Sequence, residues 1–308
     1  MSNILVIRGA ADIGTLRAYA PDARIQEVDH LQALSDVAAT SILVLRSGAY
    51  LGEHELKALP CLRHVIRTGS GLDNIDLEAL SRRAIVVHRN PEVSAPAVAE
   101  WVLASALMLA RRMPLGHAML AGGMHDKAAC MGTPLAQMAV GVWGAGPVGL
   151  AAARALAPYV ARITHAHWPS NPQGLPQSPS HELAHQAQVH VIALPLRTAT
   201  RQLIGPEFLK QAASQRPFLI CAGRLETLDV AACLRALKAG TISGLAIDGI
   251  ERQHLPMLEP QRTPMNLLIS PHIGAQRTDV RAALNRWAAE LVREISQRDH
   301  TTLAGDPR

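Results

Sequence analysis

The ten residues Val140-Gly-Val-Trp-Gly-Ala-Gly-Pro-Val-Gly149 decide the fold of this chain of 308 residues. The first four are apolar and typical of a buried strand. Three glycines with the spacing GxGxxG follow directly, and an alanine-rich helical stretch continues to Leu156. A strand, a glycine turn and a helix in this order are the context in which such glycines bind a dinucleotide. We therefore interpret the segment as the start of a Rossmann unit.

Each glycine of the motif has its own task. Gly144 permits the tight turn, Gly146 lets a pyrophosphate approach the backbone, and Gly149 lets the helix pack close to the strand. The helix begins at Pro147, which fixes the first turn but has no N–H, and the free N–H groups from Val148 onward and the positive end of the helix dipole are expected to face the phosphates. These residues are the expected phosphate-binding part of a cofactor site.

On both sides of this segment, short apolar runs alternate with helical patterns. Such a βαβ rhythm is typical of parallel sheets covered by helices. The sequence therefore predicts the α/β class, with two Rossmann-like parallel-sheet domains. The expected strands are 4–7, 42–45, 65–66, 85–87, 140–143, 162–166, 189–194, 218–220, 245–247 and 267–269. The expected helices include 51–59, 77–83, 97–112 and 278–298, with loops at 121–134 and 168–180.

Composition limits the function classes. Hydrophobic residues make up 48% and aromatic residues only 3%, so Ala, Leu, Val and Ile must fill the core. The net charge of +5 comes from scattered basic residues, which indicates a mildly basic surface that favours anionic ligands and argues against a nucleic-acid partner. The apolar stretch 97–110 contains Glu100 and is too short to span a bilayer, so we expect no membrane association.

The cysteines point to a reducing compartment. They are widely spaced and form no CxxC pair, which is typical of free thiols. The first expected strand starts at Ile4, without a preceding signal peptide. We therefore expect a cytoplasmic protein. The four cysteines are Cys61, Cys130, Cys221 and Cys233.

The end of the second Rossmann strand bears on the choice of cofactor. NAD sites usually place an acidic residue there to bind the ribose diol, but residues 164–168 contain none. The missing carboxylate removes the usual repulsion of a 2′-phosphate, so NADP is weakly favoured over NAD. The alternative is that other groups bind the ribose of NAD. The polar side chains near this strand end are Arg162, His165, His167, Ser170 and Asn171.

One motif has a competing interpretation. The segment His181-Glu-Leu-Ala-His185 spells HExxH, a zinc-protease pattern. It lies inside the Rossmann part without an evident third ligand. We therefore expect a surface helix and no metal site.

Several motifs, in order, resemble the D-isomer-specific 2-hydroxyacid dehydrogenases, a family that includes phosphoglycerate dehydrogenase, formate dehydrogenase and glyoxylate/hydroxypyruvate reductase. The resemblance covers nearly the whole chain. It is carried by residues 67–76, 98–100, 144–149, 194–200, 219–224 with Asp229, 246–248 and 270–274.

The resemblance implies a role for each matched residue. His272 is the acid/base that exchanges a proton with the substrate oxygen while hydride moves to or from the nicotinamide. Arg224 binds the substrate carboxylate and carbonyl oxygen, for which its planar fork is suited. Backbone N–H groups of Ser70 and Gly71 bind the same carboxylate. The resemblance also places Pro195 and Asp248 beside the cofactor, with Asp248 approaching the nicotinamide. His167, at the end of the second Rossmann strand, is the further expected cofactor contact.

The resemblance also implies a domain organisation. Residues 1–93 and 276–308 form a discontinuous substrate domain, residues 94–275 form the dinucleotide-binding domain, and the active site lies in the cleft between them. Family members pair as homodimers through the cofactor domains, and the apolar helix near 97–109 suits such a surface.

The chain departs from the family at the partner of the catalytic histidine. The resemblance places a glutamate at position 253, where this chain has Gln253, and the nearest carboxylate is that of Glu251. A glutamate stabilises the imidazolium and fixes its tautomer, whereas a glutamine orients the ring without charge. Ser94 and Leu225-Glu226 are further departures.

Three functions follow from these observations. The first is an oxidoreductase that uses NADP or NAD with a small 2-oxo or 2-hydroxy acid. The second is a reductase with a non-standard substrate, which uses the altered site. The third is a non-catalytic dinucleotide sensor. Arg224 and His272 argue for catalysis, whereas Gln253 favours the sensor.

Overall fold

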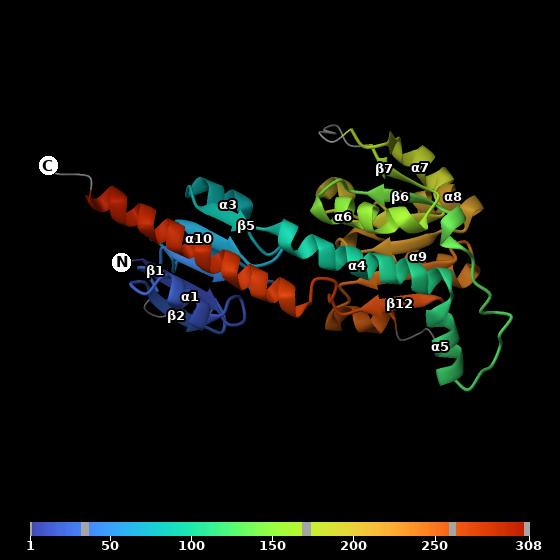
Figure 1. Ribbon diagram of the computed structural model, residues 1–308, viewed down its shortest axis with the longest axis horizontal. Helices are drawn as coiled ribbons and strands as arrows, with labels where there is room; N and C mark the ends of the chain where they lie inside the picture. Colours follow the sequence, from blue (N-terminus) through green and yellow to red (C-terminus); the bar gives the residue numbers. More distant parts are fainter. Residues whose placement is uncertain (1, 32–36, 168–173, 259–262, 305–308) are drawn as a thin grey trace. The chain divides into compact units, whose positions relative to one another are not determined.

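A computed structural model describes residues 2–31, 37–167, 174–258 and 263–304, with side chains as far as residue 298 (Figure 1). The chain divides into two units. Unit 1 comprises Met1–Ser94 and Arg277–Arg308, and unit 2 comprises Ala95–Gln276. These bounds differ by one residue from the expected ones. Both units are α/β with parallel sheets, so the predicted fold class is confirmed.

Unit 1 contains a five-stranded parallel sheet in the order β2-β1-β3-β4-β5. The central strands β1 and β3 are almost entirely buried, as expected for a sheet covered on both faces. Strand β2 was not expected from the sequence, because its pattern RIQEV is polar and no residue of it is fully buried. The strands are β1 (Asn3–Ile7), β2 (Arg24–Val28), β3 (Ile42–Leu45), β4 (His64–Arg67) and β5 (Val86–Arg89).

The helices of unit 1 come from both ends of its sequence. Helix α1 (Ile13–Tyr19) begins at Asp12, whose carboxylate accepts the N–H of Thr15 at 2.6 Å. The long helix α10 (Thr278–Ala304) lies beside α1 (Figure 1). Its apolar face completes the core of unit 1 with Ala288, Ala289, Val292 and Ile295.

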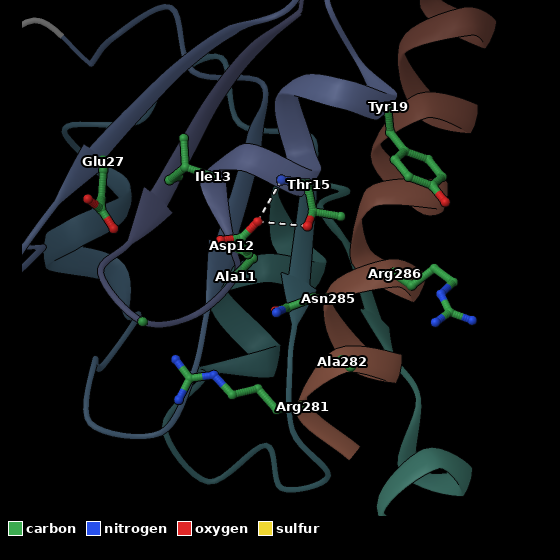
Figure 2. Close-up of a pocket in the computed structure, with 11 residues that line it drawn as sticks. Ala11, Asp12, Ile13, Thr15, Tyr19, Glu27, Arg281, Ala282, Asn285 and Arg286 are labelled. Atoms are coloured by element: carbon green, nitrogen blue, oxygen red, sulfur yellow. Dashed lines mark hydrogen bonds between the residues drawn. The ribbon is translucent and has the colours of Figure 1, made fainter. Parts of the chain in front are cut away.

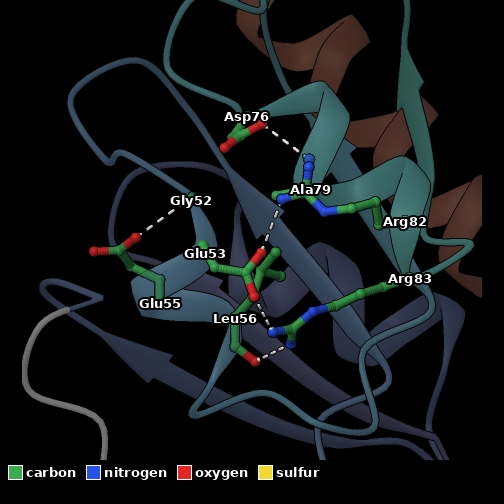
Figure 3. Close-up of polar contacts among 8 residues, drawn as sticks. All are labelled: Gly52, Glu53, Glu55, Leu56, Asp76, Ala79, Arg82 and Arg83. Carbon is green, nitrogen blue, oxygen red and sulfur yellow. Dashed lines mark hydrogen bonds and ion pairs between the residues drawn. The ribbon is translucent and has the colours of Figure 1, made fainter.

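Two short helices of unit 1, α2 (Glu53–Leu56) and α3 (Leu77–Arg82), are joined by an ion-pair network (Figure 3). The carboxylate of Glu53 accepts hydrogen bonds from Arg82 at 3.2 Å and Arg83 at 2.6 Å. Arg83 also donates to the carbonyl of Leu56 at 2.7 Å. This network connects the end of α3 to α2. It therefore stabilises the position of α3, the helix that follows the loop after β4.

Unit 2 contains a seven-stranded parallel sheet in the order β12-β11-β10-β9-β6-β7-β8. The chain runs outward from β6 to β7 and β8, and then returns to β9 on the other side of β6. Ligands of such sheets bind beside this reversal, at the carboxyl ends of the strands. The strands are β6 (Ala139–Trp143), β7 (Arg162–Ala166), β8 (Gln177–Ser178), β9 (Val189–Ile192), β10 (Phe218–Cys221), β11 (Gly244–Asp248) and β12 (Leu267–Ser270).

Helices cover both faces of this sheet, with two buried apolar clusters. The α-helices are α4 (Pro91–Ala110), α5 (Met113–Ala121), α6 (Pro147–Leu156), α7 (Ser180–Gln186), α8 (Pro206–Ala212) and α9 (Val230–Ala239). The 3-10 helices are η1 (Leu135–Gln137), η2 (Ala157–Tyr159), η3 (Thr198–Thr200), η4 (Ala213–Gln215), η5 (Leu225–Thr227) and η6 (Arg252–Met257).

Helix α4 corrects one expectation. It has twenty residues, and by length and composition it is apolar enough to cross a membrane, so the segment is not too short. The error arose because the helix was expected to begin at residue 97, whereas it begins at Pro91 and continues through Pro96. One face of α4 lies in the core of unit 2, which accounts for its composition as that of a core helix.

A buried histidine interrupts the apolar core of unit 2. His190, in β9, accepts a hydrogen bond on Nδ1 from Nε1 of Trp143 at 3.1 Å. The ring of Phe208 contacts both side chains edge-on, with centroids 5.0 and 5.4 Å away. Burial lowers the pKa of His190 to about 3, so the ring is neutral in the folded chain.

Candidate active site

The glycine turn after β6 has the geometry that a dinucleotide needs. Gly144 has a φ of +110°, and a Cβ there would lie 2.6 Å from the carbonyl oxygen of Ala193. A Cβ at Gly149 would collide with the carbonyl oxygen of Gly144, so the helix packs directly on the turn. Only glycine fits at either position.

Gly146 differs from its two neighbours in the motif. A Cβ there would meet no atom of the chain within 4 Å, so the space beside its backbone is open. Gly146 is also the N-cap of α6, and Pro147 and Val148 form the first turn. The first N–H groups of a helix lack intrahelical acceptors and attract anions. An open backbone beside a helix N-terminus fits a dinucleotide pyrophosphate.

The positions of the polar side chains along and after β7 show which of them could contact the ribose of the cofactor. Arg162 is the first residue of β7 and pairs with Ala139, so it lies at the amino end, away from the glycine turn. His165 is buried, and burial lowers its pKa. His167 is exposed just after the strand, with its N–H donated to the carbonyl of Ser178 at 2.9 Å. Ser170 and Asn171 lie outside the described residues.

Arg224 follows β10 and is placed by close backbone packing. A Cβ at the preceding Gly223 would lie 2.6 Å from the carbonyl oxygen of Leu194, so the turns after β10 and β9 touch. The carbonyl of Arg224 accepts the hydroxyl of the buried Thr227 at 2.6 Å. Neither Gly223 nor Thr227 was singled out from the sequence, although a glycine before the arginine was a usable signal.

The contacts of Pro195 and Cys221, in and beside these turns, indicate structural roles. The carbonyl of Pro195 accepts the hydroxyl of Thr200 at 2.7 Å, which closes the turn after β9. Cys221 is fully buried, and desolvation raises its pKa to about 11. Its thiol is therefore neutral and has no nucleophilic role.

His272 lies in the turn after β12 with a φ of +57°, a left-handed conformation that is uncommon for residues with a Cβ. The neighbouring strand β11 ends at Asp248, which pairs in register with Ser270. Oδ1 of Asp248 accepts the hydroxyl of Ser270 at 2.7 Å and the N–H of Ile273 at 2.8 Å. Oδ2 accepts the N–H of Gly274 at 2.8 Å. Asp248 thus bonds to both sides of His272.

Gln253 and Glu251 follow β11 and bond to each other. The amide of Gln253 donates to the carboxylate of Glu251 at 2.9 Å, and both side chains are exposed. The backbone N–H of Glu251 donates to Nδ1 of His254 at 3.0 Å. Within the described ranges, no hydrogen bond joins either side chain to His272. The proposed partnership with His272 stays a prediction.

The loop after β4 in unit 1 carries the proposed carboxylate-binding residues. Thr68 anchors its start by donating to the carbonyl of Ala10 at 2.6 Å. The carbonyl of Ser70 accepts a hydrogen bond from Arg89 at 2.8 Å. Among the residues that the structure describes, the N–H groups of Ser70 and Gly71 have no acceptor. These two donors are therefore available to an anion.

A pocket with a volume of about 600 Å³ lies elsewhere in unit 1, beside α1 and α10 (Figure 2). Asp12, Glu27, Arg281 and Arg286 line it, and none of the predicted site residues does. Figure 2 shows Arg286 and Arg281 extending from different sides of α10. The lining mixes both charges and shows no convergent set of donors, so we assign no ligand to it.

The HExxH motif forms α7, a short helix with His181, Glu182 and His185 exposed. Across the described ranges, no group of three or more His, Cys, Asp or Glu side chains is arranged to bind a metal ion.

Together these features define a class: an α/β protein of two parallel-sheet units, one of which carries a dinucleotide-binding glycine turn. Comparison with known proteins narrows this class. The family model "D-isomer specific 2-hydroxyacid dehydrogenase, NAD binding domain" matches residues 103–274. The chain belongs to this family, whose members are NAD(P)-dependent oxidoreductases.

Individual relatives agree. Glyoxylate/hydroxypyruvate reductase B of Yersinia pestis (strain Pestoides F) is 30% identical over 247 residues, which cover 77% of this chain and 76% of the reductase. D-3-phosphoglycerate dehydrogenase of Methanocaldococcus jannaschii is 28% identical over 271 residues, covering 86% of this chain and 51% of that enzyme. This chain therefore spans about half the length of the latter.

A solved structure shows the same fold. The crystal structure of D-lactate dehydrogenase from Aquifex aeolicus, in complex with NAD and lactic acid, matches with a TM-score of 0.83 and 20% sequence identity. The match covers 99% of this chain and 98% of that enzyme.

Proposed function

We propose that this protein reduces a small 2-oxo acid to its D-2-hydroxy acid, with hydride supplied by a nicotinamide cofactor. One observation carries the proposal. The sheet order β12-β11-β10-β9-β6 places five turns side by side at one edge of unit 2. The residues that end these strands or lie in the turns after them are, in that order, His272, Asp248, Arg224, Pro195 and Gly144. The cofactor loop and both catalytic candidates thus share one edge.

Each residue has a separate task in the proposed reaction. The bound cofactor supplies the hydride that reduces the carbonyl carbon. His272 donates the proton that the carbonyl oxygen acquires. Arg224 binds the carboxylate and polarises the carbonyl, since its planar fork suits two oxygens. Ser70 and Gly71, in unit 1, offer two backbone N–H groups to an anionic substrate. Unit 1 is then the substrate-binding unit, and unit 2 the cofactor-binding unit.

The test is a panel of 2-oxo acids of increasing size. Turnover of each acid is measured as the loss of NADPH or NADH absorbance. We expect turnover with at least one acid. Arg224→Lys should raise KM more than it lowers kcat, because the ammonium group of lysine cannot bind two oxygens at once as the planar guanidinium of arginine does. His272→Asn should lower kcat by about 10²- to 10⁴-fold. If neither variant differs from the wild type, the assignment is wrong.

We also propose that NADP(H) binds at least as tightly as NAD(H). Among the described side chains at the end of β7 there is no carboxylate, and His167 is exposed there. Calorimetric titration with both cofactors tests this, and a clear preference for NAD would contradict it. His167→Asp should reverse the preference, because the new carboxylate repels a 2′-phosphate and accepts the ribose hydroxyls.

A second candidate is a dinucleotide-binding sensor without catalysis. The bond between Gln253 and Glu251 favours it, because neither side chain is engaged with His272. The same experiments separate the two functions: a sensor binds the cofactor by calorimetry and turns over no acid of the panel. A reductase with a non-standard substrate would instead turn over only compounds outside that panel.

We further propose a cytoplasmic homodimer. Large apolar side chains are exposed along α4, α5 and the loop that follows, and a gathering of such side chains is typical of an interaction surface. They are Leu107, Met113, Leu120, Met124 and Met131. Light scattering tests the dimer, and Leu120→Lys, at a side chain that is 64% exposed, should shift the mass toward the monomer. An unchanged mass of one chain in both proteins would refute it.

A further inference from the structure

We infer that Asp248 is the positioning residue for His272, holding the histidine turn in its left-handed conformation. The inference rests on the proposed function, because it takes His272 as the proton donor. It assigns to Asp248 a role different from the cofactor contact that the family resemblance suggests. All the contacts involved lie within unit 2.

The hydrogen bonds show which groups the carboxylate holds. Ser270 precedes the turn and donates its hydroxyl to Oδ1, while Ile273 and Gly274 follow His272 and donate their N–H groups to Oδ1 and Oδ2. All three bonds measure 2.7–2.8 Å. Asp248 therefore fixes the backbone on both sides of His272.

The turn needs such an anchor. A φ of +57° places the Cβ of His272 in a region that L-residues disfavour, so the backbone would relax without outside support. Asp248 and Ser270 are each only 7% exposed, so water does not compete effectively for their bonds. The β11–β12 ladder brings the two residues into register, which makes the anchor part of the sheet.

The surrounding glycines leave room for this arrangement. A Cβ at Gly274 would lie 2.8 Å from Oδ2 of Asp248, so only glycine allows the carboxylate to approach the turn. A Cβ at Gly249 would lie 3.6 Å from Nδ1 of His272, so the imidazole lies against the backbone that follows Asp248. The ring and the carboxylate are thereby placed by the same short segment.

Four variants test the inference. Asp248→Asn keeps one acceptor oxygen but presents an NH₂ group to a backbone N–H. Gly274→Ala displaces the carboxylate without changing any charge. Ser270→Ala removes one donor, and Ser270→Thr restores it. For each, we would measure amide hydrogen exchange at Ile273 and Gly274, cofactor affinity by calorimetry, kcat, and folding by circular dichroism.

We expect Asp248→Asn and Gly274→Ala to accelerate amide exchange in the turn at least tenfold and to lower kcat about 10- to 100-fold, with cofactor affinity unchanged. Ser270→Ala should do so more weakly, and Ser270→Thr should match the wild type. The Gly274→Ala and Ser270 variants keep the inference testable if Asp248→Asn does not fold.

Two results would overturn the inference. One is unchanged exchange at Ile273 and Gly274 in Asp248→Asn or Gly274→Ala. The other is a loss of cofactor affinity as large as the loss of kcat/KM, which would make Asp248 a cofactor contact. Failure of the proposed function is a different outcome: the wild type would turn over no 2-oxo acid, while exchange in the variants would still accelerate.

Discussion

The buried imidazole of His190 should make unit 2 sensitive to mild acid. Its pKa of about 3 in the folded chain lies well below the value of 6.5 for a solvated histidine. Between these values the unfolded chain binds a proton that the folded chain does not, so stability is complete above pH 6.5 and falls as the pH falls. The loss is about 1.4 kcal/mol for each pH unit. At pH 5, His190 alone should cost about 2 kcal/mol.

The test compares the wild type with His190→Asn by urea unfolding at pH 7.5 and pH 5. Asparagine does not titrate, and its carbonyl can replace Nδ1 as the acceptor for Trp143. Tryptophan fluorescence follows unfolding, and Trp143, one of the four tryptophans, contacts His190. The wild type should lose about 2 kcal/mol more than the variant between the two pH values.

A matched control is His181→Asn, which removes an exposed histidine from α7 in the same unit. Its pH dependence should equal that of the wild type. His165 also titrates below its usual range, but it is present in all three proteins and cancels in the difference. If the wild type and His190→Asn lose the same free energy of unfolding on acidification, burial does not control this histidine.

Other predictions concern the cofactor turn and the partner of the catalytic histidine. Gly146→Val should weaken NADPH and NADH binding at least tenfold with Tm unchanged, because its side chain enters open space, whereas Gly149→Val should destabilise the fold by about 1–3 kcal/mol through overpacking. Equal Tm values for the two variants would refute this. Gln253→Glu should raise the rate of reduction near neutral pH, because a carboxylate favours a protonated imidazole. If Glu251 is the true partner, Glu251→Gln abolishes activity instead, and pH–rate profiles of both variants decide.

The sequence predicted the strands whose residues are buried on both faces, since a short continuous apolar run such as 42–45 is typical of a strand inside a parallel sheet. It also predicted β5, β7 and β12, which are less buried. It did not predict β2, an edge strand with a polar pattern, or β8, which has only two residues. It placed the start of α4 six residues late. The helix begins at Pro91, since proline is favoured in the first turn of a helix, and it continues through Pro96.

The same rule explains helix α5, which was not expected from the sequence. The sequence predicted a helix that ends at residue 112 and no helix directly after it. Pro114 in fact lies in the first turn of α5, and Gly122 ends that helix. A proline marks a boundary in either case, and only the surrounding packing decides on which side of it the helix lies.

The candidate site was predictable where it depends on local sequence. The glycine turn was found because its spacing and its context are contiguous. The bonds of Asp248 to Ser270 and Gly274 depend on the register of two strands that lie about twenty residues apart, and no local pattern encodes that register. The bond between Gln253 and Glu251 depends on side-chain rotamers, which spacing alone does not determine.

The discontinuity of unit 1 has a consequence for the order of synthesis. Its five strands lie before Ser94, but four apolar residues of its core belong to α10, and the whole of unit 2 is translated in between. At about 5–20 residues per second, the ribosome takes about 10–40 s to make that insert. During this time the first-made sheet lacks the helix that covers it, while unit 2 can already fold. The core of unit 1 is therefore completed only after unit 2 has been made. We expect nascent chains to depend on chaperones until α10 emerges from the ribosome.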